Sequence, residues 1–585
     1  MCRGKKRVLV IENVTTFREE LIEILENEGY DVIPAKTADE GRERLAEEWV
    51  HLALVDTRAK VPEVDLPSDE SGLDLVLDTS HPSYGVIPRL ILTGFPGWDM
   101  VRKALAPDEK GITPAEDYLV KGVDSPEEIL EKIGETIERW WNPHLRIDWE
   151  ASTPICLVSF LEPAEKWQDG QLLAQRAAEL TFLLCRAYAD EPQIRKLSIR
   201  QVRRGHAHTF IAFVRTHPDD YTLGREDVLK CGPRDDIVQE AQNFEIYVRP
   251  YTNQIHVQTV SQTTRYAAIR YTPAGRRLSA CETFKDFYRD SEENVIIALL
   301  RTLFQGQNTP LRNWYHEKRE EKKVHEGEDI FAHYNRVLRI GERERTRQIE
   351  GKGPIERWLT SLEKGSPLGI HLEKHGNSLT VNVSYLDTFE VKDFMSLVFG
   401  EKTLPLSGPY LWSITHGDLN GENILVDESN IPWLIDFERT GWGPAFRDFA
   451  ELESVIRWEL LRTNNMRDIV AFEEVLLAAE LRSVDETMSL VENNGREWAA
   501  DLKKAAHVIL HLRDIAGAIY GRGKRAYQEY LVGIFFYALR FVSKDGITSP
   551  GQVRSPLVRK THALLSALMI AHGAQNGWKW EFVGD

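Results

Sequence analysis

The sequence predicts an α/β doubly wound domain with a five-stranded parallel sheet, followed by a bilobal α+β domain. Three observations lead to this prediction. Short apolar runs alternate with amphipathic helical stretches five times before residue 145. A second set of strands with one helix follows at 196–275. After residue 449, apolar residues recur mainly at the spacing of amphipathic helices. A chain of 585 residues is also too long for a single core.

These patterns divide the chain into a first domain, a connecting strand and helix, a strand-rich lobe, and a helical lobe that holds an insert. The predicted bounds are 1–145, 146–195, 196–275 and 276–585, with the insert at about 310–405. The insert combines charged helices with a strand pair that turns at Gly376-Asn377. Two interpretations of it remain open, a substrate-selecting element and a solvated helical cover.

The composition indicates a well-solvated chain of net charge -18, with 73 basic and 91 acidic residues. This balance argues against a polyanion-binding surface along the chain, so we expect no nucleic-acid partner. After residue 500 the sign reverses, with 12 basic against 6 acidic residues. The five cysteines lack C-x-x-C spacing, which is typical of reduced thiols. With no exported leader and no membrane span visible, a cytoplasmic protein is expected.

In the first domain, polar side chains stand where the strands end. Glu12 and Asn13 close the strand RVLVIEN, and the later strands carry Asp56, Thr93 and Lys121 at their ends. Function gathers at the carboxyl ends of strands in parallel sheets. An acid, a hydroxyl and an amine on separate strands therefore predict a phosphoryl site.

Residues 6–140 resemble a response-regulator receiver domain. The resemblance implies that Asp56 is the phospho-acceptor, Thr93 the switch hydroxyl and Lys121 the lysine that pairs with phosphate. It also implies a sensor histidine kinase or a small phospho-donor as partner, and a homodimer through the receiver. Receivers usually hold Mg²⁺ with two acids after the first strand, whereas Glu12 is followed here by a neutral asparagine. A phosphorylated receiver and a degenerate docking receiver both remain open.

The stretch THGDLNGENILVDESNIPWLIDFE, residues 415–438, predicts a hairpin with polar side chains at its open end. A symmetric turn centred on 429–430 would place Asn423 opposite Asp436, with Asp418 five residues upstream. A carboxylate and an amide oxygen suit Mg²⁺. A second carboxylate can orient and deprotonate a hydroxyl during phosphoryl transfer. The stretch therefore predicts a phosphotransferase site.

The pattern H-G-D-L-N-x-x-N, with the hairpin and I-D-F after it, resembles aminoglycoside phosphotransferases and choline-kinase-like enzymes, which have a protein-kinase-like fold. The resemblance implies ATP and Mg²⁺ as cofactors and transfer to a hydroxyl acceptor. Asp418 would be the catalytic base, Asn423 and Asp436 the Mg²⁺ ligands, and His416 and Asp448 structural residues. The alternative is a pseudokinase that binds nucleotide without transfer and acts as a signalling scaffold.

Such a fold needs an upstream lobe, and residues 196–275 supply candidates. The strand DVLKCG carries Lys230, and the helix after it offers Glu240 ten residues later, with Glu245 as a substitute. Kinase-like enzymes use such an ion pair to place the lysine on the nucleotide phosphates. Gly205 is the one glycine of the turn RRGHAHT, which equally fits an ordinary hairpin. The strand at 264–275 is expected to lead to the hinge.

The receiver, the phrase VLKCG and HGDLNGENILVD together resemble kinase-like domains described as ternary-complex-associated in bacterial conflict systems, which implies signalling or defence. We therefore predict a cytoplasmic phosphotransferase regulated through Asp56. Its acceptor, a small molecule or a protein, is not identified. The basic tail disfavours a polycationic aminoglycoside. His511, Arg513 and Asp514 on a tail helix are either acceptor-cleft residues or satisfied polar groups of a packed helix.

Overall fold

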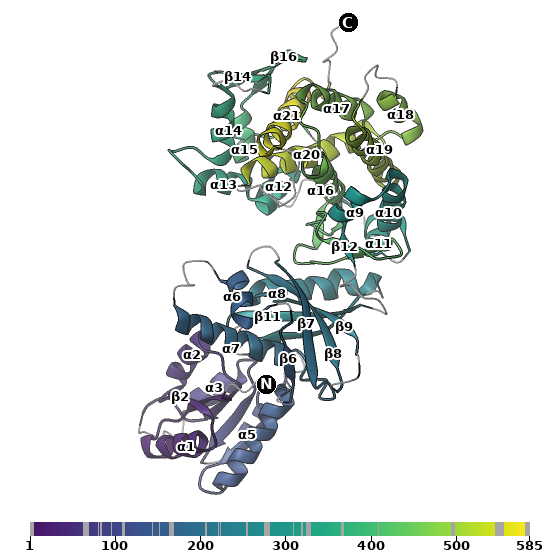
Figure 1. The fold of residues 1–585 in the computed structure, drawn as a ribbon. Helices are drawn as coiled ribbons and strands as arrows, with labels where there is room; N and C mark the ends of the chain where they lie inside the picture. Colours follow the sequence, from purple (N-terminus) through teal and green to yellow (C-terminus); the bar gives the residue numbers. More distant parts are fainter. Residues whose placement is uncertain are drawn as a thin grey trace. The chain divides into compact units, whose positions relative to one another are not determined.

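The computed structural model describes residues 5–579 except 63–68, 80, 82–84, 95, 108–111, 143, 151, 163–168, 205–207, 220–221, 223, 253–254, 274–280, 308, 318–319, 323–328, 364–367, 407–408, 493–497 and 545–554. The chain forms two compact units, coloured along the sequence in Figure 1. Unit 1 is Met1–Gln242 with Asn253–Ser279, and unit 2 is Asn243–Thr252 with Ala280–Asp585.

Unit 1 begins with a five-stranded parallel sheet in the order β2-β1-β3-β4-β5, which confirms the predicted doubly wound domain. All residues of β3 and β4 are buried, as expected for apolar strands covered by helices on both faces. The elements are β1 (Arg7–Ile11), α1 (Thr15–Asn27), β2 (Asp31–Ala35), α2 (Ala38–Glu47), β3 (Leu52–Asp56), α3 (Ser71–Leu77), β4 (Arg89–Thr93), α4 (Trp98–Leu105), β5 (Asp117–Val120) and α5 (Pro126–Trp140).

The second sheet of unit 1 has six strands in the order β10-β11-β9-β8-β7-β6. The edge strand β6 comes from the segment 146–195, which was predicted as a connecting strand and helix. It pairs in parallel with β7, whereas the other strand pairs of this sheet are antiparallel. The elements are β6 (Arg146–Asp148), α6 (Pro154–Leu161), α7 (Gly170–Arg186), β7 (Lys196–Arg204), β8 (Phe210–His217), β9 (Glu226–Pro233), α8 (Arg234–Asn243), β10 (Ile255–Gln262) and β11 (Tyr266–Pro273).

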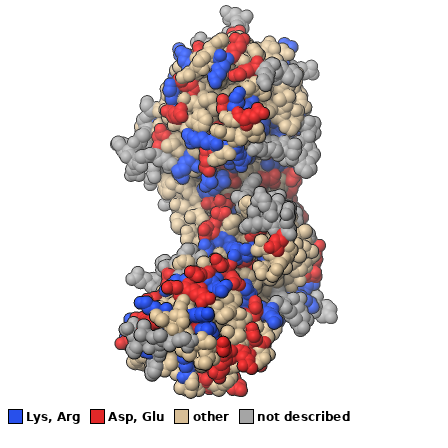
Figure 2. All heavy atoms as spheres, turned by 90° about the vertical axis from the view of Figure 1, so that its left-hand side faces the viewer, with Lys and Arg blue, Asp and Glu red and all other residues tan. Residues whose placement is uncertain are grey.

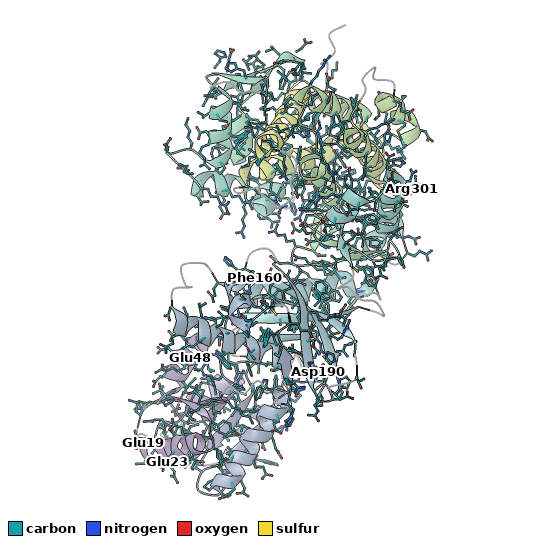
Figure 3. All side chains as sticks on the ribbon, in the orientation of Figure 1. Glu19, Glu23, Glu48, Phe160, Asp190 and Arg301 are labelled. Atoms are coloured by element: carbon teal, nitrogen blue, oxygen red, sulfur yellow. The ribbon has the colours of Figure 1, made fainter. Side chains whose placement is uncertain are left out.

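The two sheets of unit 1 share one hydrophobic core. A continuous cluster of buried apolar side chains extends from Val8 on β1 through Leu183 on α7 to Ala268 on β11. Glu48, labelled in Figure 3, accepts a hydrogen bond from Thr264 on its carbonyl oxygen at 2.9 Å. Its carboxylate pairs with Arg7 at 2.6 Å. The parallel sheet and the six-stranded sheet therefore form one folded body.

Unit 2 is mainly helical, and its core surrounds a helix that is buried along its whole length, α16 (Arg447–Ser454). The other α-helices are α9 (Phe284–Asp290), α10 (Glu293–Gln305), α11 (Pro310–Glu317), α12 (Ile330–Leu338), α13 (Ile340–Thr346), α14 (Pro354–Glu363), α15 (Phe394–Phe399), α17 (Met466–Ala479), α18 (Val484–Glu492), α19 (Ala500–Tyr520), α20 (Lys524–Ser543) and α21 (Pro556–Gln575). Among the residues that the structure describes, two short π-helices, η2 (Phe244–Val248) and η5 (Val455–Leu460), and one 3-10 helix, η3 (Arg249–Tyr251), complete the set. Within the described ranges, no helix has the length and apolar character needed to cross a membrane.

Three small sheets, each of three strands, complete the described part of unit 2. Their orders are β12-β18-β19, β13-β17-β20 and β14-β15-β16. The strands are β12 (Glu282–Thr283), β13 (Glu320–Lys322), β14 (Ile370–His375), β15 (Ser378–Val383), β16 (Leu386–Lys392), β17 (Tyr410–Thr415), β18 (Ile424–Val426), β19 (Pro432–Leu434) and β20 (Gly441–Pro444). The predicted strand pair of the insert is β14 with β15.

The hairpin of β18 and β19 is present, but its predicted register was wrong by one residue. Ile424 pairs with Leu434, and the carbonyl of Asn423 accepts from the backbone N–H of Ile435 at 3.1 Å. Asp436 therefore lies one residue beyond the position opposite Asn423. The cause is the turn, where the carboxylate of Asp427 accepts from two later backbone N–H groups at 2.8 and 3.0 Å. The turn that this carboxylate organises differs from the symmetric loop that the sequence suggested.

Candidate functional site

The loop after β17 is fixed by a buried carboxylate. The backbone N–H groups of His416 and Gly417 donate to Asp448 at 2.7 and 2.9 Å. Asp448 lies at the start of α16 with 0% exposure, and the hydroxyl of Tyr315 donates to it as well. A buried carboxylate needs such donors, because burial without them is costly. The loop that carries Asp418 therefore starts from a rigid support.

Gly417 lets the chain turn tightly at this point. Its φ is +79°, and a Cβ placed there would lie 2.2 Å from the carbonyl oxygen of Arg439. Only glycine fits both conditions without rearrangement. Next to it, the ring Nε2 of His416 lies 3.1 Å from the carbonyl oxygen of Ile435. The start of the loop is thereby joined to the residue that precedes Asp436.

The structure brings Asp418 and Asn423 together. The side-chain amide of Asn423 donates to the carbonyl oxygen of Asp418 at 2.8 Å and to its carboxylate Oδ2 at 3.3 Å. The amide of Asn420 reaches the same Oδ2 at 3.3 Å. These bonds use the amide nitrogen of Asn423, whose amide oxygen retains its acceptor capacity. The loop thus presents one oriented carboxylate and one amide oxygen.

The other oxygen of Asp418 faces two arginines. Its Oδ1 lies 3.3 Å from Nη2 of Arg540 and 3.7 Å from Nη1 of Arg439. Arg540, on α20, also pairs with Glu451 on α16 at 2.7 Å. Burial, and then the nearby charge of Asp418, raises the pKa of Glu451 to about 7. The guanidinium of Arg540 therefore pairs with two carboxylates.

Sequence reasoning missed Arg540 as a site residue. It stands 122 positions after Asp418, inside the apolar run YLVGIFFYALRFV. A single charge within such a run is the signal that could have indicated it, because a buried charge needs a partner.

Asp436 stands at the end of the hairpin with a left-handed backbone, φ +71°. The segment after it is held by Asn243, whose amide donates to the carbonyl oxygens of Phe437 and Glu438 at 3.3 and 2.6 Å. In the described part of the chain, no group of three His, Cys, Asp or Glu side chains could hold a metal alone. The amide oxygen of Asn423 and the carboxylate of Asp436 fit Mg²⁺ only with oxygens of a substrate or water as further ligands.

In unit 1, the predicted contact between Lys230 and Glu240 is confirmed. The ammonium of Lys230 on β9 donates to Oε2 of Glu240 on α8 at 2.6 Å, and both side chains are buried. The hydroxyl of Tyr271 on β11 donates to Oε1 of Glu240 at 2.6 Å. Glu245, the substitute, pairs instead with Arg249 at 3.1 Å, where both are about half exposed. Gly205 lies outside the described residues.

The receiver residues also gather at one edge of their sheet. Lys121 lies 2.7 Å from Glu12 and 3.0 Å from Asp56. Burial, and then the charge of Asp56, raises the pKa of Glu12. The hydroxyl of Thr93 lies 3.4 Å from that of Thr57. The three residues from separate strand ends thus form a compact charged cluster.

Asn13 points its amide toward the carbonyl oxygen of Val61, to which it donates at 3.2 Å. In contrast, its neighbour Glu12 contacts Lys121 at 2.7 Å and is the acid that follows the first strand in this cluster.

The polar residues of the tail helix have structural partners. Arg513 is buried and pairs with Glu453 at 2.7 Å, and Asp514 pairs with Arg522 at 2.6 Å. The ring Nδ1 of His511 lies 2.9 Å from the carbonyl oxygen of His507. These contacts favour packed polar groups over an acceptor cleft.

Residues 403–542 match the family described as Ternary complex associated domain 9. This range contains the loop of Asp418, the hairpin, α16 and nearly all of α20. No curated protein matches the chain.

Solved receiver structures are similar to the first part of unit 1. A response regulator receiver domain protein from Methanospirillum hungatei is 30% identical and covers 23% of this chain and 95% of its own, with a TM-score of 0.19. A response regulator from Thermotoga maritima is 21% identical and covers 23% and 98%, also with a TM-score of 0.19. The receiver fold rests on the strand order 2-1-3-4-5 and on the cluster of Glu12, Asp56 and Lys121.

Proposed function

We propose that the chain is an ATP- and Mg²⁺-dependent phosphotransferase that acts on a hydroxyl acceptor, with a receiver part that regulates it in bacterial signalling or defence. One observation carries the proposal. The loop that begins on the buried carboxylate of Asp448 presents Asp418 and Asn423 side by side, with their side chains joined by a hydrogen bond. An oriented carboxylate beside an amide oxygen fits two roles in kinase-type phosphoryl transfer, the base that receives the hydroxyl proton and a ligand of Mg²⁺.

In the proposed reaction the acceptor oxygen attacks the γ-phosphorus of ATP. The bond from that phosphorus to the β,γ-bridging oxygen breaks, ADP leaves with the electron pair, and the hydroxyl proton passes to Asp418. The contacts to Asn420, Asn423 and Arg540 fix the direction of this carboxylate. Mg²⁺, held by Asn423 and Asp436, would neutralise charge on the phosphate oxygens.

In this proposal, Lys230 binds the phosphates of the nucleotide. Its ammonium donates to Glu240 at 2.6 Å, and this contact fixes the position of the lysine on β9. Tyr271 holds the other oxygen of Glu240, so the glutamate is positioned on both sides. An ion pair of this kind supports nucleotide binding in kinase-like enzymes.

Regulation through Asp56 is the second part of the proposal. Its support is the cluster of Asp56, Glu12 and Lys121, which follows the carboxyl ends of the strands. The sheet that carries Lys230 shares its hydrophobic core with the receiver sheet. A change in the packing of the receiver part would therefore reach that sheet through buried side chains.

The direct test uses γ-labelled ATP, Mg²⁺ and a bacterial lysate with the purified full chain. We expect label in an acceptor with the wild type and none with Asp418→Asn or Asp436→Ala. The matched control is Asp427→Asn, which changes a carboxylate of the same hairpin that caps its turn. Transfer that persists in both site variants would refute the proposal.

A nucleotide-binding scaffold without transfer is the second candidate. It is favoured by the engagement of Asp418, since both carboxylate oxygens already have protein partners. This candidate predicts that ATP raises the unfolding temperature of the wild type and not of Lys230→Ala, while no acceptor in a lysate gains label.

A further inference from the structure

The insert contributes the helix α13, in and beside which three arginines follow one another at intervals of four residues. Arg339, Arg343 and Arg347 stand four residues apart, along and at the ends of α13. Residues at this spacing are neighbours on a helix, and like charges at i and i+4 destabilise it by about 0.2–0.5 kcal/mol per pair. Figure 2 shows Lys and Arg side chains gathered on the face of unit 2 that carries α13. Arg339 also lies 3.9 Å from Glu342, which offsets part of the repulsion between these arginines.

Arg343 is the central member of this set. Its Nη1 is buried and has no hydrogen-bond partner among the residues that the structure describes. Burial first, and then the charges of Arg540, Arg347, Arg439 and Arg339, lower the pKa of Arg343 to about 10. A partly buried arginine that has other cations near it and a buried Nη1 without a partner in the described residues is suited to bind an anion.

Two other arginines in the electrostatic surroundings of Arg343 lie near the candidate catalytic residue. Arg439 and Arg540, which both act on Arg343, lie 3.7 and 3.3 Å from Oδ1 of Asp418. They come from the segment after the hairpin and from α20, and α13 packs against α20. We name Arg339, Arg343, Arg347, Arg439 and Arg540 the basic cluster.

A further cation belongs to the same surroundings. Burial, and then the charge of Arg540, lowers the pKa of Lys544 to about 8, while Glu459 and Asp418 act in the opposite direction. Lys544, which directly follows α20, thus adds a cation whose charge interacts with that of Asp418.

We propose that the acceptor is a small alcohol that already bears a phosphate group, which the basic cluster binds while its hydroxyl is directed to Asp418. This inference rests on the proposed phosphotransferase function and names its substrate class. Guanidinium groups bind phosphate oxygens in pairs of parallel hydrogen bonds, and Arg343 has an unused donor for this purpose.

The chemistry is that of the proposed transfer, with the phosphate already present on the acceptor left intact. The acceptor hydroxyl oxygen forms the new bond to the γ-phosphorus, ADP leaves with the electron pair of the broken P–O bond, and Asp418 receives the proton. Arg343 and Arg439 position the acceptor and take no part in bond making. A cationic acceptor, such as an aminoglycoside, would be repelled by the same cluster.

Two measurements test the inference. In the first, the small-molecule fraction of a lysate is treated with alkaline phosphatase, which is then removed, and is offered with labelled ATP to the full chain. Transfer should fall at least about tenfold relative to a mock-treated fraction, because the loss of one charged hydrogen-bonded group costs about 1.4 kcal/mol or more.

In the second, calorimetry measures the binding of inorganic pyrophosphate to the full chain. We expect Arg343→Gln and Arg439→Gln each to weaken binding about tenfold. The matched control, Arg345→Gln, lies on the same helix, where its guanidinium packs 5.2 Å from the centre of the Phe399 ring. This control should bind pyrophosphate as the wild type does.

The outcomes separate the inference from the function on which it rests. Transfer that is equal with treated and mock-treated fractions would overturn the inference and leave the phosphotransferase intact. Absence of any transfer, with pyrophosphate binding that depends on Arg343, would overturn the function and leave an anion site. Pyrophosphate binding that is the same in all four proteins would overturn the basic cluster as a phosphate site.

Discussion

Nη2 of Arg540 lies 3.3 Å from Oδ1 of Asp418, in the interior of unit 2. The same guanidinium pairs with Glu451 at 2.7 Å, so it holds two carboxylates that would otherwise repel each other. This relationship links the candidate catalytic loop to α20 and is the contact from which the first prediction follows.

Arg540→Gln should destabilise unit 2 by about 3–5 kcal/mol, because it leaves two largely buried carboxylates without their cation. Urea unfolding measures the change. The matched control on the same helix is Lys524→Gln, whose exposed ammonium donates to the carbonyl oxygen of Gly577 at 3.3 Å; it should cost at most about 1 kcal/mol. Adding Glu451→Gln to Arg540→Gln should recover part of the loss, and equal costs for Arg540→Gln and Lys524→Gln would contradict this account.

Gly417→Ala should lower both stability and phosphotransfer, because the new Cβ would strike the carbonyl oxygen of Arg439 and displace the loop. Gly376→Ala is the control. Gly376 also has a positive φ, +62°, but no atom lies within 4 Å of the place that a Cβ would take there. The control should cost only the strain of a left-handed alanine, about 1–2 kcal/mol. Gly417→Ala with full activity would show that the loop position is not critical.

Unit 1 should lose stability in acid through His51. This ring packs against Trp49, Trp141 and Phe182, and its Nδ1 accepts from the backbone N–H of Arg7 at 2.9 Å. Burial, and then the charges of Lys6, Arg7 and Arg186, lower its pKa to about 3.

The lowered pKa of His51 fixes the direction in which the stability of unit 1 changes with pH. Below pH 6.5 the unfolded chain protonates the histidine while the folded chain does not, so stability is complete above pH 6.5 and falls as the pH approaches 3. The loss should be on the order of 3–5 kcal/mol. Urea midpoints followed by tryptophan fluorescence measure it. His51→Leu should flatten the dependence, and the exposed His144→Leu should not; parallel curves for both variants would contradict the prediction.

Acetyl phosphate with Mg²⁺ should add one phosphoryl group to Asp56, because Lys121 already lies 3.0 Å from its carboxylate and can pair with the new charge. Intact-protein mass spectrometry detects the adduct. Asp56→Asn should remove it, whereas Asp78→Asn, outside the cluster, should keep it. A wild type that gains no phosphoryl group would favour the degenerate docking receiver that Asn13 suggests.

The sequence predicted those parts of the fold that depend on local pattern. Alternating apolar runs and helices were sufficient for the parallel sheet, because each strand and each helix shows its own period. The contact of Lys230 with Glu240 could also be predicted from the sequence, because a helix that follows a strand directly can pack against it in only a few ways. Their role in nucleotide binding stays a prediction.

Other features depended on contacts that no local pattern encodes. The hairpin register shifted by one because the side chain of Asp427 took over the turn. Arg540 reached Asp418 from another helix, and α13 of the insert packs against that helix. Strand β6 joined a sheet whose remaining strands begin about 50 residues later, which only the tertiary fold determines.

The rate of γ-phosphate transfer from ATP, compared between the wild type and Asp418→Asn, tests the central claim most directly. The variant keeps the shape of the side chain but removes the base. At a temperature well below the unfolding transition of both proteins, we predict that transfer falls by about 10²- to 10⁴-fold, and that the unfolding temperature also falls because the ion pair of Asp418 with Arg540 is lost. A variant that transfers phosphate as fast as the wild type, or a wild type that transfers none to any acceptor, would contradict it.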